Sequence, residues 1–355
     1  MATRPTGAPP PRGNLGRAEW DEFARQTVAR QRLAPLVTRD LEHLSIPDAP
    51  RARIEAAAKR DAIEALHRIA ENKRILDRFT ADGVEPVVLK GWPLSLRLYG
   101  DAGLRQGRDL DILIPPEALA DCHSALSQLG YRPMQSGDHR ERLIGSRTLL
   151  RECNDLEYFH TANNHCVELA WRAHPVAGFP DMTADPANTR WLQTPIGHVK
   201  VLTDQAELIY LVLHGMLHMW LRLKWLVDIA RLMELRGSDA LEQDVALATE
   251  LGIGKAMRFS LFLAHMILKT PLPPSLQGPP PAQFERQAMA VMHHMVRPQS
   301  EVAGMAARWQ FYRFALPMAD TGAQLIGHLR FGAWRRLAMG FAGLTARPPE
   351  RRGAL

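Results

Sequence analysis

The chain has 355 residues, 46% hydrophobic and 23% charged, which is the composition of a globular protein. Its net charge of +6 is concentrated near the two ends, so it permits an anionic partner without locating one. The three cysteines include no CxxC pair, which argues against a disulfide framework.

The start of the chain is rich in Pro, Gly and Arg and has no apolar signal-peptide segment. No uninterrupted apolar run reaches the roughly 18 residues of a membrane-spanning helix. We therefore expect a cytoplasmic protein with a disordered tail over residues 1–16.

Residues 17–83 are predicted to form helices that pack on the following domain. Apolar residues recur at helical spacing from Arg17 to Thr38, and Pro50 opens a long apolar stripe that ends at Asp82-Gly83.

The stretch from Val87 to Ile114 predicts strand, turn, helix, loop and strand. Lys90-Gly91 interrupts the first strand, Pro93 suits the first turn of a helix, and Gly100 ends that helix.

Asp109 and Asp111 alternate with apolar residues in the second of these strands. A strand places them on one face, roughly 7 Å apart, where they repel one another unless a cation lies between them. Hard divalent ions take carboxylate and phosphate oxygens, and a phosphate fits the Gly91 turn at the helix start. The pattern favours metal-assisted phosphoryl or nucleotidyl transfer, although an isolated Asp-x-Asp is also common on exposed strand faces.

The order of these motifs resembles the nucleotidyltransferase superfamily of DNA polymerase beta. More closely, it resembles a bacterial family of uncharacterised nucleotidyltransferases found near peptide natural-product and polysaccharide genes. The residues that carry this resemblance are Leu89-Lys90-Gly91, Tyr99, Arg105, Asp109, Asp111 and the later segment Leu126–Tyr131.

The resemblance implies a third carboxylate on a neighbouring strand. Residues 156–161 and 165–171 suggest a hairpin, and Glu168-Leu-Ala-Trp171 matches the family's acidic-Leu-His-Trp pattern except for the histidine. Glu168 is the expected ligand and Glu157 the reserve candidate. The alternative is that Glu168 only faces solvent.

The resemblance also implies nucleotide binding by Lys90, Gly91, Arg105 and Arg108, whose charges and N–H groups suit phosphate. One of the three basic residues is expected to be structural instead. Trp92 stands where the superfamily has a phosphate-binding serine, so backbone N–H groups must suffice there.

From Thr203, a helix N-cap, the chain is predicted to be helical to its end. His214, His218, Lys224 and Asp228 are weaker candidates for substrate contact, because the family carries histidines followed by Trp-x-x-Asp here. The alternatives are core histidines and an Asp228 that forms an ion pair within the bundle. No Glu follows the first His, so a metalloprotease zinc site is not expected.

Residues 325–344 predict a basic amphipathic helix. Such a helix can rest on a membrane or a partner, but more often it is a core helix with basic edges. No recognised nucleic-acid-binding module is present.

Together these features predict an α+β fold: a small mixed or antiparallel sheet with flanking helices, followed by a helical bundle. The expected units are 84–202 (catalytic), 203–270 (bundle) and 271–355 (helical extension).

The expected activity is Mg2+-dependent transfer of an NMP, with Mn2+ as a substitute ion and ATP as the default NTP. Asp109, Asp111 and Glu168 are expected to hold the metal. The acceptor is an unidentified hydroxyl or phosphate, on a peptide natural product, a sugar phosphate or a protein. The alternative is a catalytically inactive nucleotide-binding or scaffold protein that kept the fold.

Overall fold

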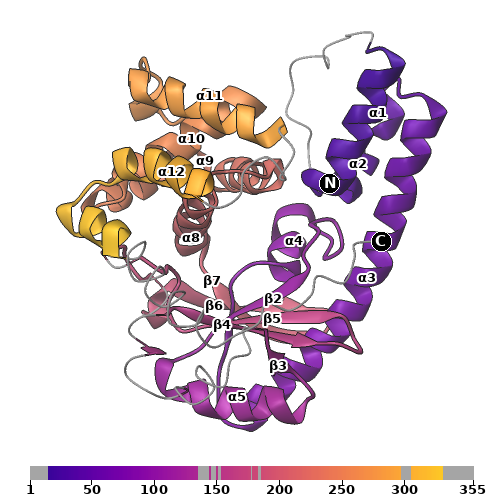
Figure 1. Ribbon diagram of the computed structural model, residues 1–355, viewed down its shortest axis with the longest axis vertical. Helices are drawn as coiled ribbons and strands as arrows, with labels where there is room; N and C mark the ends of the chain where they lie inside the picture. Colours follow the sequence, from indigo (N-terminus) through magenta and orange to yellow (C-terminus); the bar gives the residue numbers. More distant parts are fainter. Residues whose placement is uncertain are drawn as a thin grey trace.

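The computed structural model describes residues 15–134, 144, 149–150, 153–176, 178–182, 185–296 and 305–330. The described chain folds as a sheet with helices on both faces and a helical bundle beyond it (Figure 1).

Seven strands form a mixed sheet in the order β3-β4-β5-β2-β1-β7-β6. Central strand β2 pairs in parallel with β5 and antiparallel with β1, and β1 pairs in parallel with β7. The predicted α+β class with a small mixed sheet is therefore confirmed. The strands are β1 (Val87–Val88), β2 (Asp109–Leu113), β3 (Arg132–Pro133), β4 (Asp155–His160), β5 (His165–Ala170), β6 (Thr189–Thr194) and β7 (Gly197–Leu202).

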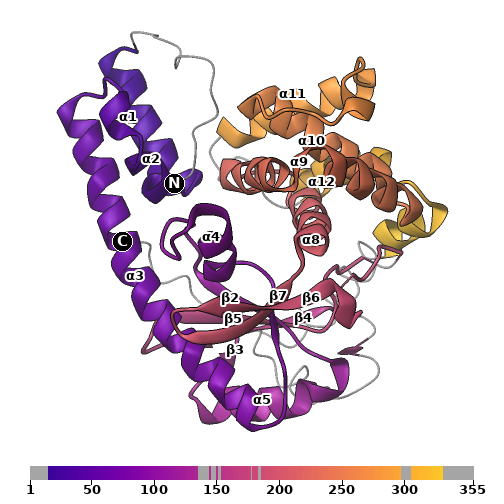
Figure 2. The same ribbon diagram turned by 180° about the vertical axis from the view of Figure 1, so that it is seen from behind.

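Separate apolar cores cover the two faces of the sheet. On one face, Ile112 of β2 and Val167 of β5 pack with side chains of α3 (Asp48–Ala81) and α5 (Leu119–Gln128). On the other, Leu113 and Ala170 belong to the core of α4 (Trp92–Tyr99) and α8 (Asp204–Leu217). Figure 2 shows α5 and the end of α3 below the sheet, and α4 and α8 above it.

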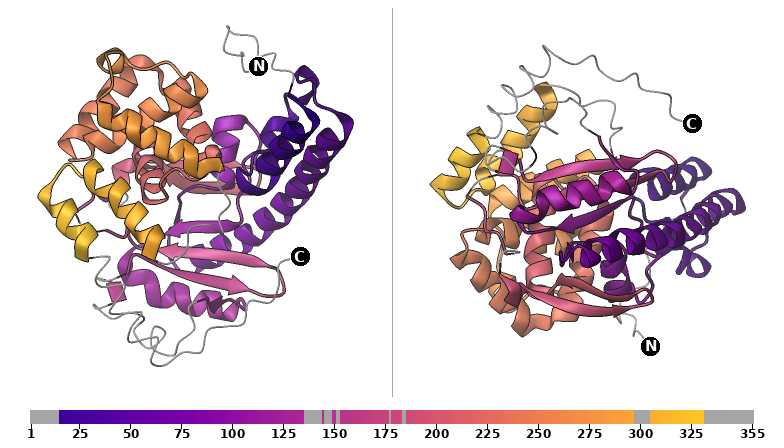
Figure 3. Two further views of the ribbon diagram at one scale, coloured as in Figure 1. Left: turned by 45° about the horizontal axis from the view of Figure 1, so that its top comes forward. Right: turned by 90° about the horizontal axis from the view of Figure 1, so that it is seen from below.

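The N-terminal region is not one continuous helix, although its apolar residues recur at helical spacing from Arg17 to Thr38. Helix α1 (Arg17–Arg25) passes into a π-helical segment, Gln26–Arg30, and α2 (Ala34–Thr38) starts only after a break. Within the break, Arg32 has a φ of 54°, which no α-helix can continue through. These helices and the start of α3 enclose a small core of their own and stand beside α4 (Figure 3).

The predicted long helix is confirmed as α3, which begins at Asp48, two residues before Pro50. The predicted hairpin is confirmed as β4 and β5, which pair antiparallel. Its turn contains Asn164 at a φ of 46°, a conformation that Asn tolerates better than most residues.

The bundle contains α8, α9 (Leu223–Glu250), α10 (Gly254–Leu268), α11 (Ala282–Val296) and α12 (Met305–Ala315). Thr203 caps α8 as predicted, because its hydroxyl accepts the N–H of Ala206. Within α9, Gly237 adopts a φ of 71° and a ψ of 170°, outside the helical region, so two helical segments meet at a kink there.

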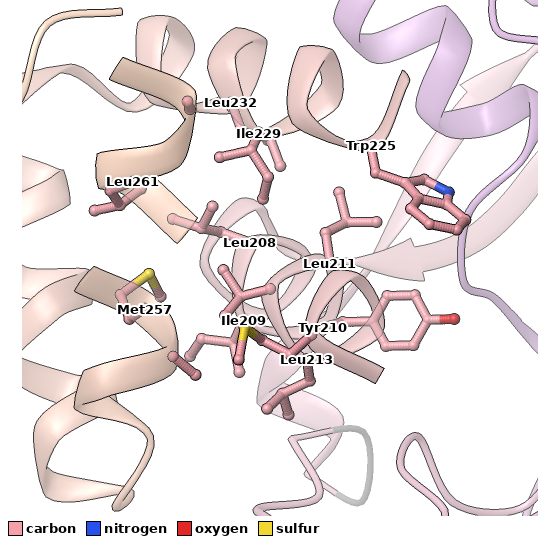
Figure 4. Close-up of a cluster of buried hydrophobic side chains, with 14 of the residues drawn as sticks. Leu208, Ile209, Tyr210, Leu211, Leu213, Trp225, Ile229, Leu232, Met257 and Leu261 are labelled. Carbon is pink, nitrogen blue, oxygen red and sulfur yellow. The ribbon is translucent and has the colours of Figure 1, made fainter. Parts of the chain in front are cut away.

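The bundle core is built from leucines and isoleucines of α8 and α9 packed against Met257 and Leu261 of α10 (Figure 4). Tyr210 and Trp225 lie at one edge of this cluster and point away from α10.

Within the described ranges, no helix combines the length and apolar character needed to cross a membrane. Of the predicted amphipathic helix over 325–344, only residues 325–330 are described. They are helical and expose Leu325, Ile326 and Leu329.

Candidate active site

The turn between β1 and α4 contains Gly91, the residue predicted to interrupt the first strand. Gly91 precedes α4 with φ 80° and ψ −138°, a conformation open essentially to glycine. A Cβ there would meet nothing within 4 Å, so backbone conformation rather than crowding requires the glycine.

Asp109 and Asp111 lie on β2, and Glu168 lies on the neighbouring strand β5. The two strands run parallel, and Asp111 is in direct register with Glu168, while Asp109 pairs with Cys166. Because side chains alternate along a strand, the three carboxylates share the face covered by α4 and α8. The aspartates differ in burial: Asp109 is exposed and Asp111 is 4% exposed.

Lys90 supplies a positive charge inside this group. Its Nζ lies 3.0 Å from Oδ1 of Asp111 and donates a hydrogen bond of 3.4 Å to the hydroxyl of Tyr210. Burial alone would lower the pKa of Lys90, but the charges of Asp111, Tyr210 and Glu168 raise it above its usual value. The residue is therefore a fixed cation of the site.

One lysine does not neutralise the carboxylates. Burial raises the pKa of Glu168 to about 8, Lys90 opposes that change, and Asp111 adds to it. Desolvation and the charge of Asp111 also raise the pKa of Asp109. Negative charge is therefore crowded on this face of the sheet.

The donor set suits a hard divalent ion. Asp111 Oδ1 is buried and accepts no hydrogen bond from the described residues, despite its ion pair with Lys90. The available ligands are carboxylate oxygens, which Mg2+ and Mn2+ prefer. Among the described residues, however, no three acidic, His or Cys side chains already converge as a metal cage. Side-chain rotation would be needed to complete one. Glu157, the reserve candidate, lies opposite Glu168 on β4.

Arg105 has a buried partner away from the carboxylates on β2. Its Nε donates to Asp228 of α9 at 2.7 Å, and the hydroxyl of Tyr99 donates to the other oxygen of Asp228 at 2.9 Å. The Arg105 N–H also donates to Ser95. These contacts connect the loop before β2 to α4 and α9. Arg105 and Asp228 therefore have a structural role in this region.

Lys224 makes a second connection of this kind. It is buried, and its Nζ donates to the carbonyl of Gln106 at 2.8 Å. Burial and the charges of Arg105 and Arg32 lower the pKa of Lys224 well below its usual value. The bundle therefore holds the loop that leads into β2 from two points.

His214 and His218 lie with Trp225 in an aromatic cluster next to Lys90. The imidazole centroids are 4.6 Å apart, and each is within 5.3 Å of the indole of Trp225. Burial and the charge of Lys90 lower the pKa of His218 to about 4 and that of His214 also, so both are neutral at pH 7. Such flat, uncharged surfaces can stack on a base.

Tyr210 was missed in the sequence. Tyr210, His214 and His218 are spaced four residues apart, so one helix face presents all three, and that spacing was the available signal. Arg32 and Arg222 were also missed, and no sequence pattern marks either of them.

The cavity of about 420 Å3 in this structure lies elsewhere. It is lined by α11, α12 and Met219, and by none of the three carboxylates.

A family model described as uncharacterised nucleotidyltransferase matches residues 16–269. No curated protein matches the chain. Among solved structures, it is similar to the antibiotic-resistance factor ANT(2'')-Ia, at 15% identity and a TM-score of 0.38, over 54% of this chain and 93% of that one. On the family match, which covers most of its length, this protein belongs to the uncharacterised nucleotidyltransferase family.

Proposed function

We propose that the protein transfers an NMP from an NTP to an acceptor hydroxyl or phosphate and releases pyrophosphate, with a divalent metal held by Asp109, Asp111 and Glu168. The observation that carries the proposal is the set of three carboxylates on parallel strands β2 and β5, opposed by the single cation Lys90. Family membership supports nucleotidyl transfer in general.

Mg2+ or Mn2+ bound by these carboxylates would neutralise charge on the triphosphate and favour attack at the α-phosphorus. The protein's own groups position the reactants. The Gly91 turn offers backbone N–H groups to phosphate, and Lys90 keeps positive charge beside the carboxylates. Glu168 is the candidate acceptor of the proton that the attacking group loses.

The site suggests a class for each substrate. ATP is the default NTP, and the His214–His218–Trp225 cluster is a candidate surface for its base. The acceptor belongs to a peptide natural product, a sugar phosphate or a protein. We propose a cytoplasmic protein whose catalytic unit is 84–202 and whose bundle, 203–270, closes over the substrates, with no specific nucleic-acid partner.

A non-catalytic nucleotide-binding or scaffold protein is the second candidate. Two observations favour it: Lys90 already pairs with Asp111, and Trp92 is buried at the position of the superfamily serine. Under this reading the fold binds nucleotide without releasing pyrophosphate.

The test is pyrophosphate release from each of the four NTPs with Mg2+, with a lysate of the source organism as acceptor. The matched variants are Asp109→Asn/Asp111→Asn and, as a control, Asp239→Asn, which changes an exposed aspartate on α9. Release that is lost in the first variant and retained in the control supports transfer. Mg2+-dependent NTP binding without release favours the scaffold reading, and neither binding nor release rejects both.

A further inference from the structure

Three arginines from separate parts of the chain gather at the exposed end of β2, beside Asp109. Arg32 lies in the break between the N-terminal helices, Arg108 directly precedes β2, and Arg222 directly precedes α9. Arg32 lies within electrostatic range of both other arginines and of Asp109, and Arg222 within range of Arg108 and Asp109.

Specific hydrogen bonds bring these segments together. The side-chain oxygen of Gln31 accepts the N–H of Leu223 at 2.6 Å, so the neighbours of Arg32 and Arg222 are in direct contact. The side-chain nitrogen of Gln31 donates to the carbonyl of Met295 at 2.9 Å.

The loop before Arg108 is fixed from two sides. Lys224 donates to the carbonyl of Gln106, and Arg68 of α3 donates to the carbonyl of Gly107 at 2.8 Å. Packing therefore brings together the three chain segments that carry these arginines.

Their charges are only partly compensated by the protein: Arg222 lies over the ring of Trp225, 5.5 Å from its centroid. In the described ranges none of the three forms an ion pair with a carboxylate, whereas Arg97, Arg105 and Arg236 all do. The charge of Asp109 acts on both Arg32 and Arg222. Burial and the neighbouring arginines lower the pKa of Arg32 to about 10, the direction expected for crowded cations.

Arg32 is also held in an unfavourable backbone conformation. Its φ of 54° is in the left-handed region, where glycine is preferred. An arginine at this position adds conformational strain and charge repulsion to the free protein. Both are removed by a glycine, so a ligand explains the arginine better than stability does.

We propose that Arg32, Arg108 and Arg222 form a polyphosphate-binding site for the β- and γ-phosphates of the NTP and for the released pyrophosphate. The proposal rests on the proposed function for the identity of the substrate. A polyphosphate fits because the three arginines lie within electrostatic range of one another and Asp109 lies near them. Guanidinium groups bind phosphate oxygens in pairs. It makes the N-terminal helices part of the active site, and it places the phosphate-binding charge on these arginines and not on Lys90, which is occupied by Asp111.

Binding of tripolyphosphate without divalent metal tests the site directly, by calorimetry at low salt on the full chain. Arg32→Gly and Arg222→Gln are each expected to weaken binding about tenfold, since each removes one charge-assisted contact. Arg32→Lys is expected to retain much of the affinity. Arg53→Gln, at an exposed position on α3, is the matched control and should leave binding unchanged.

Thermal unfolding separates a binding role from a structural one. Arg32→Gly should unfold at the same temperature as the parent or higher, while it loses affinity. A lower unfolding temperature together with unchanged tripolyphosphate binding would overturn the proposal, as would equal losses in Arg32→Gly and Arg53→Gln.

The two proposals can fail separately. Tripolyphosphate binding that depends on Arg32 and Arg222, without pyrophosphate release from any NTP, keeps the polyphosphate site and rejects the transfer reaction. Transfer whose KM for NTP is the same in Arg32→Gly, Arg222→Gln and the parent keeps the reaction and rejects the site.

Discussion

The inner and outer parts of the site handle charge in opposite ways. In the inner part, Lys90 pairs with Asp111, and Arg105 pairs with Asp228 at a position where both side chains are at most 3% exposed. In the outer part, Arg32, Arg108 and Arg222 surround the exposed Asp109 without ion pairs among the described residues.

This difference separates charges that build the site from charges that await a ligand. A buried charge needs a partner within the protein, because its desolvation is otherwise uncompensated. A cluster of like charges that is only partly buried keeps part of its solvation, and a bound anion relieves its repulsion. Pairing therefore distinguishes the two kinds of arginine better than proximity to the aspartates does.

The largest effect is expected from loss of a carboxylate on β2. Asp111→Asn leaves Lys90 without its anionic partner and removes a proposed metal ligand, so NMP transfer should fall about a thousandfold or more. Pyrophosphate release at saturating Mg2+ and NTP measures this. Activity within tenfold of the parent would remove Asp111 from the reaction.

The buried pair Arg105–Asp228 should give the largest loss of stability. Asp228→Ala leaves a buried guanidinium unpaired, which costs about 3–5 kcal/mol of unfolding free energy. Urea denaturation of this variant beside Asp239→Ala measures the loss. The double variant Arg105→Met/Asp228→Leu should recover part of it. Unchanged stability with a raised KM would instead make Asp228 a substrate contact, as the family pattern suggests.

Salt should affect the outer cluster more than the inner one. Raising ionic strength screens partly exposed charges more than buried ones, so the KM for NTP should rise several-fold in the parent and little in Arg32→Gly/Arg222→Gln. Initial rates from about 0.05 to 0.5 M NaCl, at constant Mg2+, measure this. Parallel curves for the two proteins would show that these arginines do not meet the substrate.

The smallest effect is expected from protonation of His165 at acidic pH, which lowers the free energy of unfolding. His165 lies on the face of the sheet opposite the carboxylates. His165 is buried between Tyr131 and Asn72, and burial lowers its pKa to about 4. The unfolded chain, with an ordinary histidine pKa of about 6.5, binds the proton first, so stability is complete above that pH and decreases as pH falls toward 4. His165 should contribute a loss of roughly 1 kcal/mol between about pH 7 and 5.5.

Urea denaturation at these two pH values, on the parent and on His165→Gln, measures the contribution. Gln can still bond to Asn72 and does not titrate in this range. An equal pH dependence in both proteins would assign the loss to other buried histidines, such as His174, whose pKa is lowered to about 3.

Patterns local in the chain allowed much of the fold to be predicted. The hydrophobic stripe of α3, the cap at Thr203 and the alternation in Asp109–Leu113 each depend on neighbours within a few residues. The prediction was less accurate at Arg32, where a single backbone angle interrupts the helical segment without changing its apolar spacing.

The amino-acid sequence by itself determined the fold class, the glycine turn before α4 and the pair of aspartates on one strand face, because these follow from backbone conformation and side-chain alternation. The parallel register of Asp111 with Glu168 and the pairing of Arg105 with Asp228 were decided only by the tertiary structure. The tertiary structure also decided the gathering of Arg32, Arg108 and Arg222. Packing there joins segments far apart in the chain, as in the contact of Gln31 with Leu223, which are 192 residues apart. Charge compensation depends on such long-range neighbours, and a sequence pattern records residue types without recording which of them meet.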